Sequence, residues 1–145
     1  MSDKAFLDTN IFIYSLDRVD PRKAKVALEI IREHAARGNG VISFQVVQEF
    51  FNVAFKRFAA VMTPEEGTGY LLTVLRPFLA VDSSIALYSA ALTICSRYQL
   101  SWYDSLILAA ASEANCSILY TEDLQHGAKI DGVRIENPFR AKTTH

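Results

Sequence analysis

Apolar and polar positions along this chain alternate between two spacings, which predicts strands and helices in turn. Apolar runs of strand length occur at residues 5–7, 41–42, 78–81, 117–120 and 133–135. Between these runs, apolar side chains recur every three or four positions, as in the series Ala24, Ala27, Leu28, Ile31 and Ala35. Strands that alternate with helices predict an α/β fold, a parallel sheet of about five strands with helices on both faces.

Helix-capping residues agree with this pattern. Asp20 precedes Pro21, which makes a strong helix start, and Gly38 ends the same helix. Further helix starts are predicted at Ser43, at a capping box that runs from Thr63 to Glu66, at Asp82 with Ser83, and at Ser101. Residues 1–145 therefore form a single domain, of which only residues 140–145 look loosely held.

Composition narrows the class of protein. Half of the residues are hydrophobic, as in a compact globule, and the net charge of −1 argues against a surface that coats nucleic acid regardless of sequence. Local basic groups are more typical of solvated helix faces; they are Arg18, Arg22, Lys23 and Lys25, and the pair Lys56 and Arg57.

The remaining bulk features point to a reducing compartment. Cys95 and Cys116 lack metal-ligand spacing and are interpreted as buried thiols. No signal-peptide pattern precedes the first apolar run, and the longest uninterrupted run covers only residues 106–111. We therefore expect a cytoplasmic protein with no membrane span.

Acidic residues follow several of the predicted strands. In a parallel sheet, ligands bind beyond the carboxyl ends of the strands, near the point where the strand order reverses. Asp8 follows the first strand, and Glu122 and Asp123 follow the strand at 117–120. Asp8 is as typical of a helix N-cap as of a ligand, whereas Asp82 is more typical of a cap alone.

Two further acids lie inside predicted helices. Glu49 borders the apolar stripe of its helix, where a solvated acid is the more common interpretation. Asp104 precedes Ile107 and Leu108 at helical spacing, so it points the same way as a core-facing stripe. A capping box of Ser101 with Asp104 is the alternative.

If these acids meet at one rim of the sheet, they need a cation. Ionised carboxylates about 5 Å apart repel by roughly 3 kcal/mol per pair at an effective dielectric constant near 20. Nothing basic lies in the local sequence around Asp8, Asp104 or Asp123 to relieve this. Either the acids stay apart, or one or two divalent cations lie among them. Oxygen ligands favour Mg²⁺ or Mn²⁺ over zinc. The chain has neither a GxxxxGK[ST] loop nor GxGxxG, which argues against a nucleotide-binding enzyme.

A family resemblance rests on segments that span nearly the whole chain, namely FLDTNIFIYSLD, DPRKAKVALEII, ISFQVVQEFFNVAFKRF, LSWYDSLILAAASEANCSILYTEDLQHG and GVRIENPF. Through them the chain resembles the PIN-domain ribonucleases, and within these the VapC-type toxins of toxin–antitoxin pairs. The resemblance implies an acidic site that binds Mg²⁺ or Mn²⁺ and hydrolyses phosphodiester bonds of RNA. It also implies a small inhibitory antitoxin and a homodimer.

The resemblance assigns catalytic and metal-binding roles residue by residue. Asp8 matches the aspartate of the D-T-N motif, and Glu49 matches the glutamate of the Q-E segment. Asp104 matches the aspartate of the W-x-D-S/A-L motif, and Asp123, rather than Glu122, matches the last aspartate. The side chains implied to orient these acids are Thr9, Asn10, Ser105 and Thr121. On this interpretation Asp8 both caps a helix and ligates a metal.

A metal-dependent endoribonuclease is therefore the leading hypothesis. Arg18, Arg22 and Lys23 are the candidates for gripping the RNA backbone. Trp102 could stack on an unpaired base, although packing at a helix end is the more common role.

Two other classes are considered. A PIN-like module that binds RNA or protein without cutting would not need the four intact acids. An aspartyl-phosphate hydrolase would need a second acid where Asn10 stands. A dimer face is predicted on one unusually aromatic helix, which carries Phe50, Phe51, Phe55 and Phe58.

Overall fold

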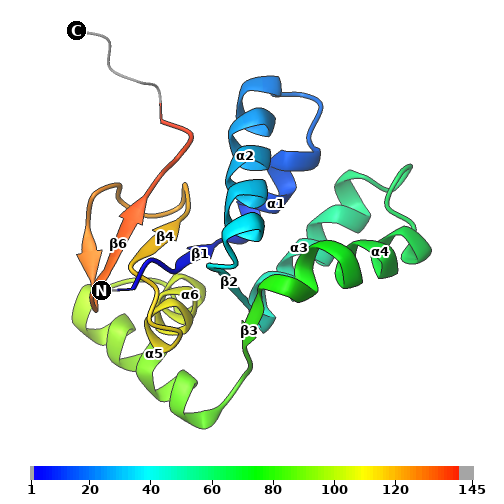
Figure 1. Ribbon diagram of the computed structural model, residues 1–145. Coiled ribbons are helices and arrows are strands. Elements are labelled where there is room, and N and C mark those ends of the chain that lie inside the picture. The colour runs from blue at the N-terminus through cyan, green and yellow to red at the C-terminus, as the bar shows by residue number, and fades with distance from the viewer. Residues whose placement is uncertain (1, 141–145) are drawn as a thin grey trace, which may run out of the picture.

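The computed structural model describes residues 2–140; residues 141–145 of the predicted loose end lie outside this range. The chain forms a six-stranded sheet in the order β3-β2-β1-β4-β6-β5 (Figure 1). The strands are β1 (Ala5–Leu7), β2 (Gly40–Ser43), β3 (Leu79–Val81), β4 (Ile118–Tyr120), β5 (Lys129–Ile130) and β6 (Val133–Glu136). The α/β fold is confirmed. The additional strand is β5, which pairs antiparallel with β6, while the other pairs are parallel.

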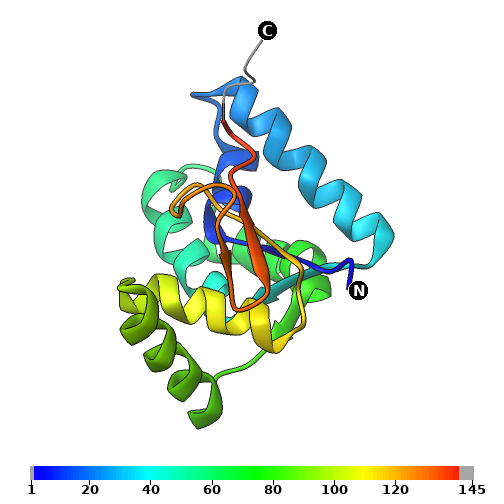
Figure 2. The ribbon, with the colours of Figure 1, turned by 90° about the vertical axis from the view of Figure 1, so that its left-hand side faces the viewer.

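Within residues 2–140, six α-helices connect the strands. They are α1 (Thr9–Leu16), α2 (Pro21–Arg37), α3 (Phe44–Arg57), α4 (Pro64–Tyr70), α5 (Ile85–Tyr98) and α6 (Trp102–Glu113). A π-helical turn (Leu71–Leu75) and a 3-10 turn (Arg76–Phe78) continue α4 towards β3. The helix α1 packs against α2 and α3, whereas α5 packs against α6. Figure 2 shows α2 and α6 on opposite sides of the sheet, as right-handed crossovers require when the strand order reverses.

Capping explains where the helices begin. The carboxylate of Asp20 accepts a hydrogen bond from the Lys23 amide at 3.1 Å, and Gly38 takes the left-handed conformation (φ 66°) that ends α2. The prediction of Asp82 and Ser83 as the cap of α5 is wrong by one or two residues. Ser84 caps this helix, because its hydroxyl accepts from the Leu87 amide at 3.0 Å.

The core corrects one part of the predicted dimer face. Phe50 is fully buried and stacks on Tyr70, with ring centroids 4.7 Å apart, so it belongs to the interior. Phe51 and Phe58 are half-buried, and Phe55 is 42% exposed.

Three further expectations concern the two cysteines, Trp102 and membrane-spanning helices. Cys116 is buried, Cys95 is half-buried, and both are free thiols. Trp102 is half-buried and lies 6.0 Å from Tyr88 between ring centroids, which is the packing role. In residues 2–140, none of the helices has the length and apolar character needed to cross a membrane.

Candidate active site

The strand order reverses between β1 and β4. The chain runs outward from β1 through β2 to β3 and then returns to form β4 on the other side of β1. Leu7 and Tyr120 are register partners, and the Asp8 amide donates to the Tyr120 carbonyl at 3.1 Å. The residues that follow β1 and β4 therefore lie side by side at the carboxyl edge of the sheet, where ligands of α/β proteins bind.

Asp8 is held from two elements at this edge. It is the N-cap of α1, and its Oδ1 accepts from the Thr9 amide at 2.7 Å. Its Oδ2 accepts from the hydroxyl of Thr121, just past β4, at 2.8 Å. The residue is only 7% exposed. The predicted capping role is thus confirmed, and the carboxylate has a fixed orientation.

Glu49 is tied to the same edge from α3. Its Oε2 accepts from the Thr9 hydroxyl at 3.1 Å, and its Oε1 accepts from Gln45 Nε2 at 2.5 Å. Gln45 also donates to the carbonyl of Tyr103 at 3.3 Å, which links α3 to the first turn of α6. Glu49 is therefore half-buried and anchored, unlike the solvated acid that its position on the helix suggested.

The acids after β4 point to different partners. Asp123 Oδ2 accepts from Asn10 Nδ2 at 3.3 Å, and the Asp123 amide donates to the Thr121 hydroxyl at 3.1 Å. Glu122 instead accepts from the Tyr14 hydroxyl at 2.5 Å and pairs with Lys23 Nζ at 3.2 Å. Glu122 is thus paired with a lysine, whereas no Lys or Arg of residues 2–140 forms an ion pair with Asp123.

A cavity of about 240 Å³ brings these groups together. It is lined by Asp8, Thr9, Asn10, Ile13, Tyr14, Glu49, Val53, Arg57, Glu122 and Asp123. Three of the four predicted site acids line it. Asp104 does not; it lies in the first turn of α6, where its amide donates to the Ser101 hydroxyl at 3.2 Å. A neighbouring hollow on the other side of Glu49 includes Tyr103, the residue before Asp104.

The acids repel one another across this cavity. Burial raises the pKa of Asp8 to about 7, against the pull of its hydrogen bonds from Thr121 and Thr9, and the charges of Asp123 and Glu49 add to the rise. Burial also raises the pKa of Asp123, with further contributions from the charges of Glu122, Asp104 and Glu49. Asp104 thus interacts electrostatically with the cavity from outside its lining.

The donors present fit a hard divalent cation. The carboxylates are joined by Asn10 Oδ1, which is buried and has no hydrogen-bond partner among the described residues. Oxygen donors of this kind suit Mg²⁺ or Mn²⁺, which would also relieve the repulsion between the acids. Within residues 2–140, no three His, Cys, Asp or Glu side chains are already arranged as a metal-binding group.

The residues expected to orient the acids behave differently from one another. Thr9, Asn10 and Thr121 each donate a hydrogen bond to a site acid. Ser105 does not, because its buried hydroxyl has no partner in the described part of the chain.

Basic residues are placed differently from the sequence-based expectation. Arg22 donates to the Phe139 carbonyl at 3.0 Å, Lys23 is paired with Glu122, and Arg18 lines a separate hollow.

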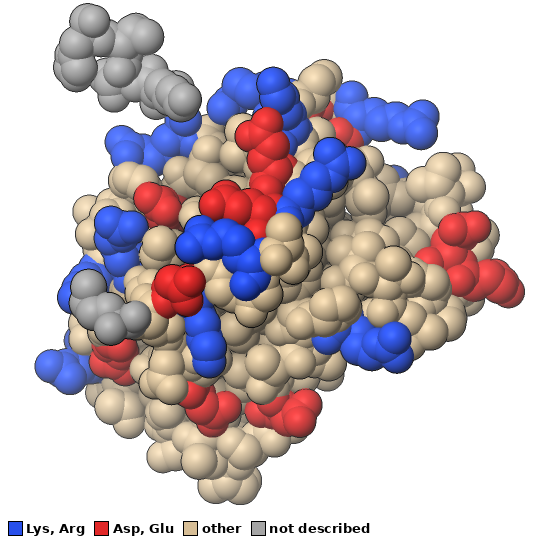
Figure 3. Space-filling model, viewed as in Figure 1, with Lys and Arg blue, Asp and Glu red and all other residues tan. Residues whose placement is uncertain are grey.

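Arg57, interpreted from the sequence as part of a solvated face, lines the acidic cavity. The signal that could have found it is its spacing of eight residues from Glu49, two turns along one helix face. Figure 3 shows basic and acidic side chains interspersed over one face of the molecule, without a continuous basic surface on that face.

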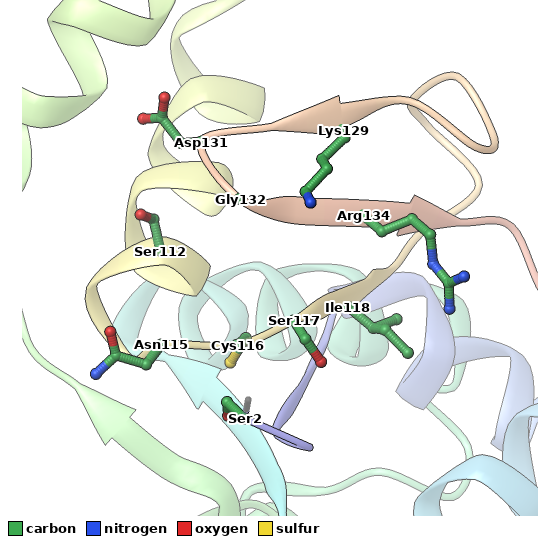
Figure 4. A pocket seen from close by; sticks show the side chains of 10 residues that line it. All are labelled: Ser2, Ser112, Asn115, Cys116, Ser117, Ile118, Lys129, Asp131, Gly132 and Arg134. Carbon is green, nitrogen blue, oxygen red and sulfur yellow. The ribbon is translucent and has the colours of Figure 1, made fainter.

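A larger hollow lies elsewhere. Its volume is about 600 Å³, and Figure 4 shows its lining, which comes from the segment before β1, the end of α6, the start of β4 and the β5–β6 hairpin. The lining residues are Ser2, Ser112, Asn115, Cys116, Ser117, Ile118, Lys129, Asp131, Gly132 and Arg134. None of the predicted site acids is among them. This cavity marks the amino end of β4, opposite the acidic one.

Known proteins were compared with the chain by sequence and by structure. Among curated protein sequences, no significant match was found. One similar solved structure is a toxin–antitoxin complex from Klebsiella pneumoniae, with 22% identity, a TM-score of 0.64, and coverage of 95% of this chain and 100% of that one. A second is VapC20 of Mycobacterium tuberculosis, described as a Sarcin-Ricin loop cleaving toxin, with 16% identity, a TM-score of 0.61, and coverage of 83% and 90%. A third is FitAcB from Neisseria gonorrhoeae, with 17% identity, a TM-score of 0.58, and coverage of 94% and 99%.

These structures share the fold of the chain at identities too low to transfer an activity. The sequence itself matches the PIN domain family over residues 5–130. That span includes all four predicted site acids and every strand from β1 to β5. The chain therefore belongs to the PIN-domain family.

Proposed function

We propose that this protein is a metal-dependent endoribonuclease that hydrolyses phosphodiester bonds of RNA. The observation that carries the proposal is the meeting of Asp8 and Asp123 beyond two adjacent parallel strands, with Glu49 tied to them through Thr9. PIN domains are typically nucleases, and these acids occupy the positions that the family resemblance assigned to catalysis.

Each acid has a role in the proposed site. Asp8, Glu49, Asp104 and Asp123 would hold Mg²⁺ or Mn²⁺. The bound cation would activate water for attack on the phosphate and stabilise the negative charge that develops there.

The remaining residues hold the acids in place. The Thr121 hydroxyl and the Thr9 amide orient Asp8, and Gln45 orients Glu49. Asn10 donates to Asp123 from the same helix that Asp8 caps. The site is thus prepared by hydrogen bonds before any cation or RNA binds.

The biological role that fits is the toxin of a toxin–antitoxin pair, acting on RNA in the cytoplasm. Two of the similar structures are described as toxin–antitoxin or toxin structures, and a small antitoxin is the proposed inhibitor of this chain. A homodimer is also proposed. Phe55 of α3 leaves an aromatic ring 42% exposed, which a second copy could cover. A Phe55→Asp protein that keeps the native oligomeric state would remove this part of the proposal.

The test is cleavage of a mixed RNA pool by purified protein, free of any bound partner. We expect cleavage with Mg²⁺ or Mn²⁺, none with chelator, and none from Asp8→Asn or Asp104→Asn. Asp131→Asn, at the other end of the sheet, is the matched control and should cleave like the wild type.

The second candidate is a module that binds RNA or protein without cutting. A folded wild-type protein that is silent with either metal, yet retains RNA on a filter, would favour this candidate. Cleavage that persists in chelator would contradict the metal site.

A further inference from the structure

Arg57 is the cation that lines the acidic cavity. It lies at the end of α3, and with Glu49 and Val53 it forms a row at i, i+4 and i+8 along the wall of the cavity. No other Lys or Arg of the described residues lines that wall. The cavity therefore combines acids that need a cation with a guanidinium that none of them binds.

A buried partner explains why Arg57 does not pair with the cavity acids. Its Nη2 donates to Oδ2 of Asp17, whose side chain is only 4% exposed. Asp17 Oδ1 accepts from the Val19 amide at 2.9 Å, so this carboxylate is held from both sides. A buried carboxylate needs a charged partner, and among residues 2–140 Arg57 is the one that Asp17 has. Asp17 thus fixes the guanidinium at the edge of the cavity.

The guanidinium keeps donors for a ligand. It carries five N–H groups, and the described residues occupy only Nη2. The Arg57 side chain is 46% exposed despite its ion pair. A phosphate group matches this arrangement, because its oxygens accept the parallel N–H donors of a guanidinium.

Lys23 provides the contrast. Its Nζ pairs with Glu122, lies 4.5 Å from the centroid of the Tyr14 ring and 5.6 Å from that of Phe139, and is half as exposed as Arg57 at 24%. Lys23 therefore connects α2 to the segment after β4 and has few donors left for a ligand. Of the candidates that the sequence suggested for contacting RNA, Arg22 and Lys23 are occupied by contacts within the chain, and Arg18 lines a separate hollow. Arg57 keeps N–H groups unused by the described residues at the acidic cavity itself.

We infer that Arg57 contacts a backbone phosphate of RNA bound at the acidic cavity, and that Asp17 is the positioning residue that holds Arg57 there. This inference rests on the proposed function and adds to it the residue that binds the substrate backbone. It gives Asp17 a role that depends entirely on Arg57.

The test is binding of a short, fluorescently labelled single-stranded RNA of mixed sequence, measured by anisotropy over a salt series. All proteins carry Asp104→Asn to prevent cleavage. Arg57→Ala is compared with Lys56→Ala, the adjacent residue of equal charge, which is exposed and does not line the cavity. Arg57→Lys separates charge from the guanidinium geometry.

Loss of one phosphate contact should lower the slope of log K against log salt by about 0.7 and weaken binding about fivefold near 0.1 M salt. We expect this for Arg57→Ala, a smaller loss for Arg57→Lys, and less than about twofold for Lys56→Ala. Asp17→Asn should weaken binding, and should add nothing in the double variant with Arg57→Ala. Thermal melting checks that Asp17→Asn folds; if it does not, the Arg57 variants carry the test.

The inference is overturned if Arg57→Ala binds RNA as tightly as the parent protein, or if Arg57→Ala and Lys56→Ala weaken binding equally. Absence of any RNA binding by the parent would also overturn it. Cleavage of the same RNA by the wild type is scored separately. RNA binding that depends on Arg57, without cleavage, would support this inference and contradict the proposed nuclease activity. Cleavage that does not depend on Arg57 would support the nuclease and contradict this inference.

Discussion

The two ends of strand β4 carry hollows of opposite character. At the carboxyl end, a cavity of about 240 Å³ gathers acids from α1, α3 and the segment after β4, and hydrogen bonds between these segments hold them. At the amino end, a cavity of about 600 Å³ has Lys129 and Arg134 on its wall, paired directly across the β5–β6 hairpin. The predicted site acids therefore gather at the smaller of the two cavities, so cavity size alone would not have located them. At the smaller end Asp8 is buried and Glu49 is half-buried, and hydrogen bonds hold both in place. At the larger end Lys129 and Arg134 are both exposed.

The largest effect that separates the two ends is the pH dependence of stability. The pKa of Asp8 is about 7 in the folded protein against 3.8 ordinarily, so the folded state binds the proton more tightly. Stability contributed by the protonated form is complete below about pH 4 and is lost as the pH rises through about 7. The difference corresponds to at most about 4 kcal/mol.

Asp8→Asn should remove most of this loss, so the variant should exceed the wild type in unfolding free energy at about pH 8 by a few kcal/mol. Urea denaturation over a pH series measures it. Mg²⁺ should stabilise the wild type more than the variant, by mass action. Asp131→Asn at the amino end is the control and should keep the wild-type profile. An unchanged pH profile in Asp8→Asn would show that another group is responsible.

A smaller effect is expected at the carboxyl end from Thr121→Val. The Thr121 hydroxyl is fully buried, donates to Asp8 and accepts from the Asp123 amide. Its removal leaves both groups short of a partner and should cost about 1–3 kcal/mol of stability. It should also raise the pKa of Asp8 further, since this hydrogen bond lowers it.

Ser117→Ala tests the same kind of change at the amino end. Among the described residues, the Ser117 hydroxyl makes a single long contact, of 3.4 Å, with the Lys4 carbonyl. The variant should therefore differ from the wild type by less than about 0.5 kcal/mol. Chemical denaturation at neutral pH compares the two variants. Equal losses at the two ends would mean that the network around Asp8 has no special weight.

The smallest expected change in stability comes from a substitution at the amino end of β4. Lys129→Glu converts the like-charged pair with Arg134 into an opposite pair and should stabilise the protein by about 0.2–1 kcal/mol. The gain should shrink in high salt, because both side chains are exposed. Melting temperatures at low and high salt measure it, and a loss of stability at low salt would contradict the expected repulsion.

Much of the fold follows from local chemistry. Apolar runs and capping residues locate five of the strands and most helix starts, because each depends on side chains that are neighbours in sequence. The two-residue strand β5 is too short for a period to appear, and it exists only through its pairing with β6. The helical pattern alone places Phe50 on a predicted dimer face, but its burial depends on Tyr70, twenty residues along the chain.

In the candidate site, too, some residues follow from local sequence and others depend on tertiary packing. The rule that ligands bind beyond strand ends leads to Asp8 and Asp123, and the helical spacing of Asp104 agrees with its electrostatic effect on the cavity. The environment of Arg57 could not be predicted, because it depends on how α3 packs against α1 and on a buried partner, Asp17, at the end of α1. Spacing along α3 gives the face that carries Arg57, but not what that face meets.

The hydrogen bond between Thr121 and Asp8 joins residues 113 positions apart. Strand β4 lies next to β1 in the sheet. β1 is synthesised early and β4 late, so the segment after β4 reaches Asp8 only late in synthesis. A growing chain on the ribosome therefore carries Asp8 and Glu49 for most of its synthesis without the segment that completes the acidic cavity. The order of translation itself delays assembly of the site until nearly the whole domain has emerged.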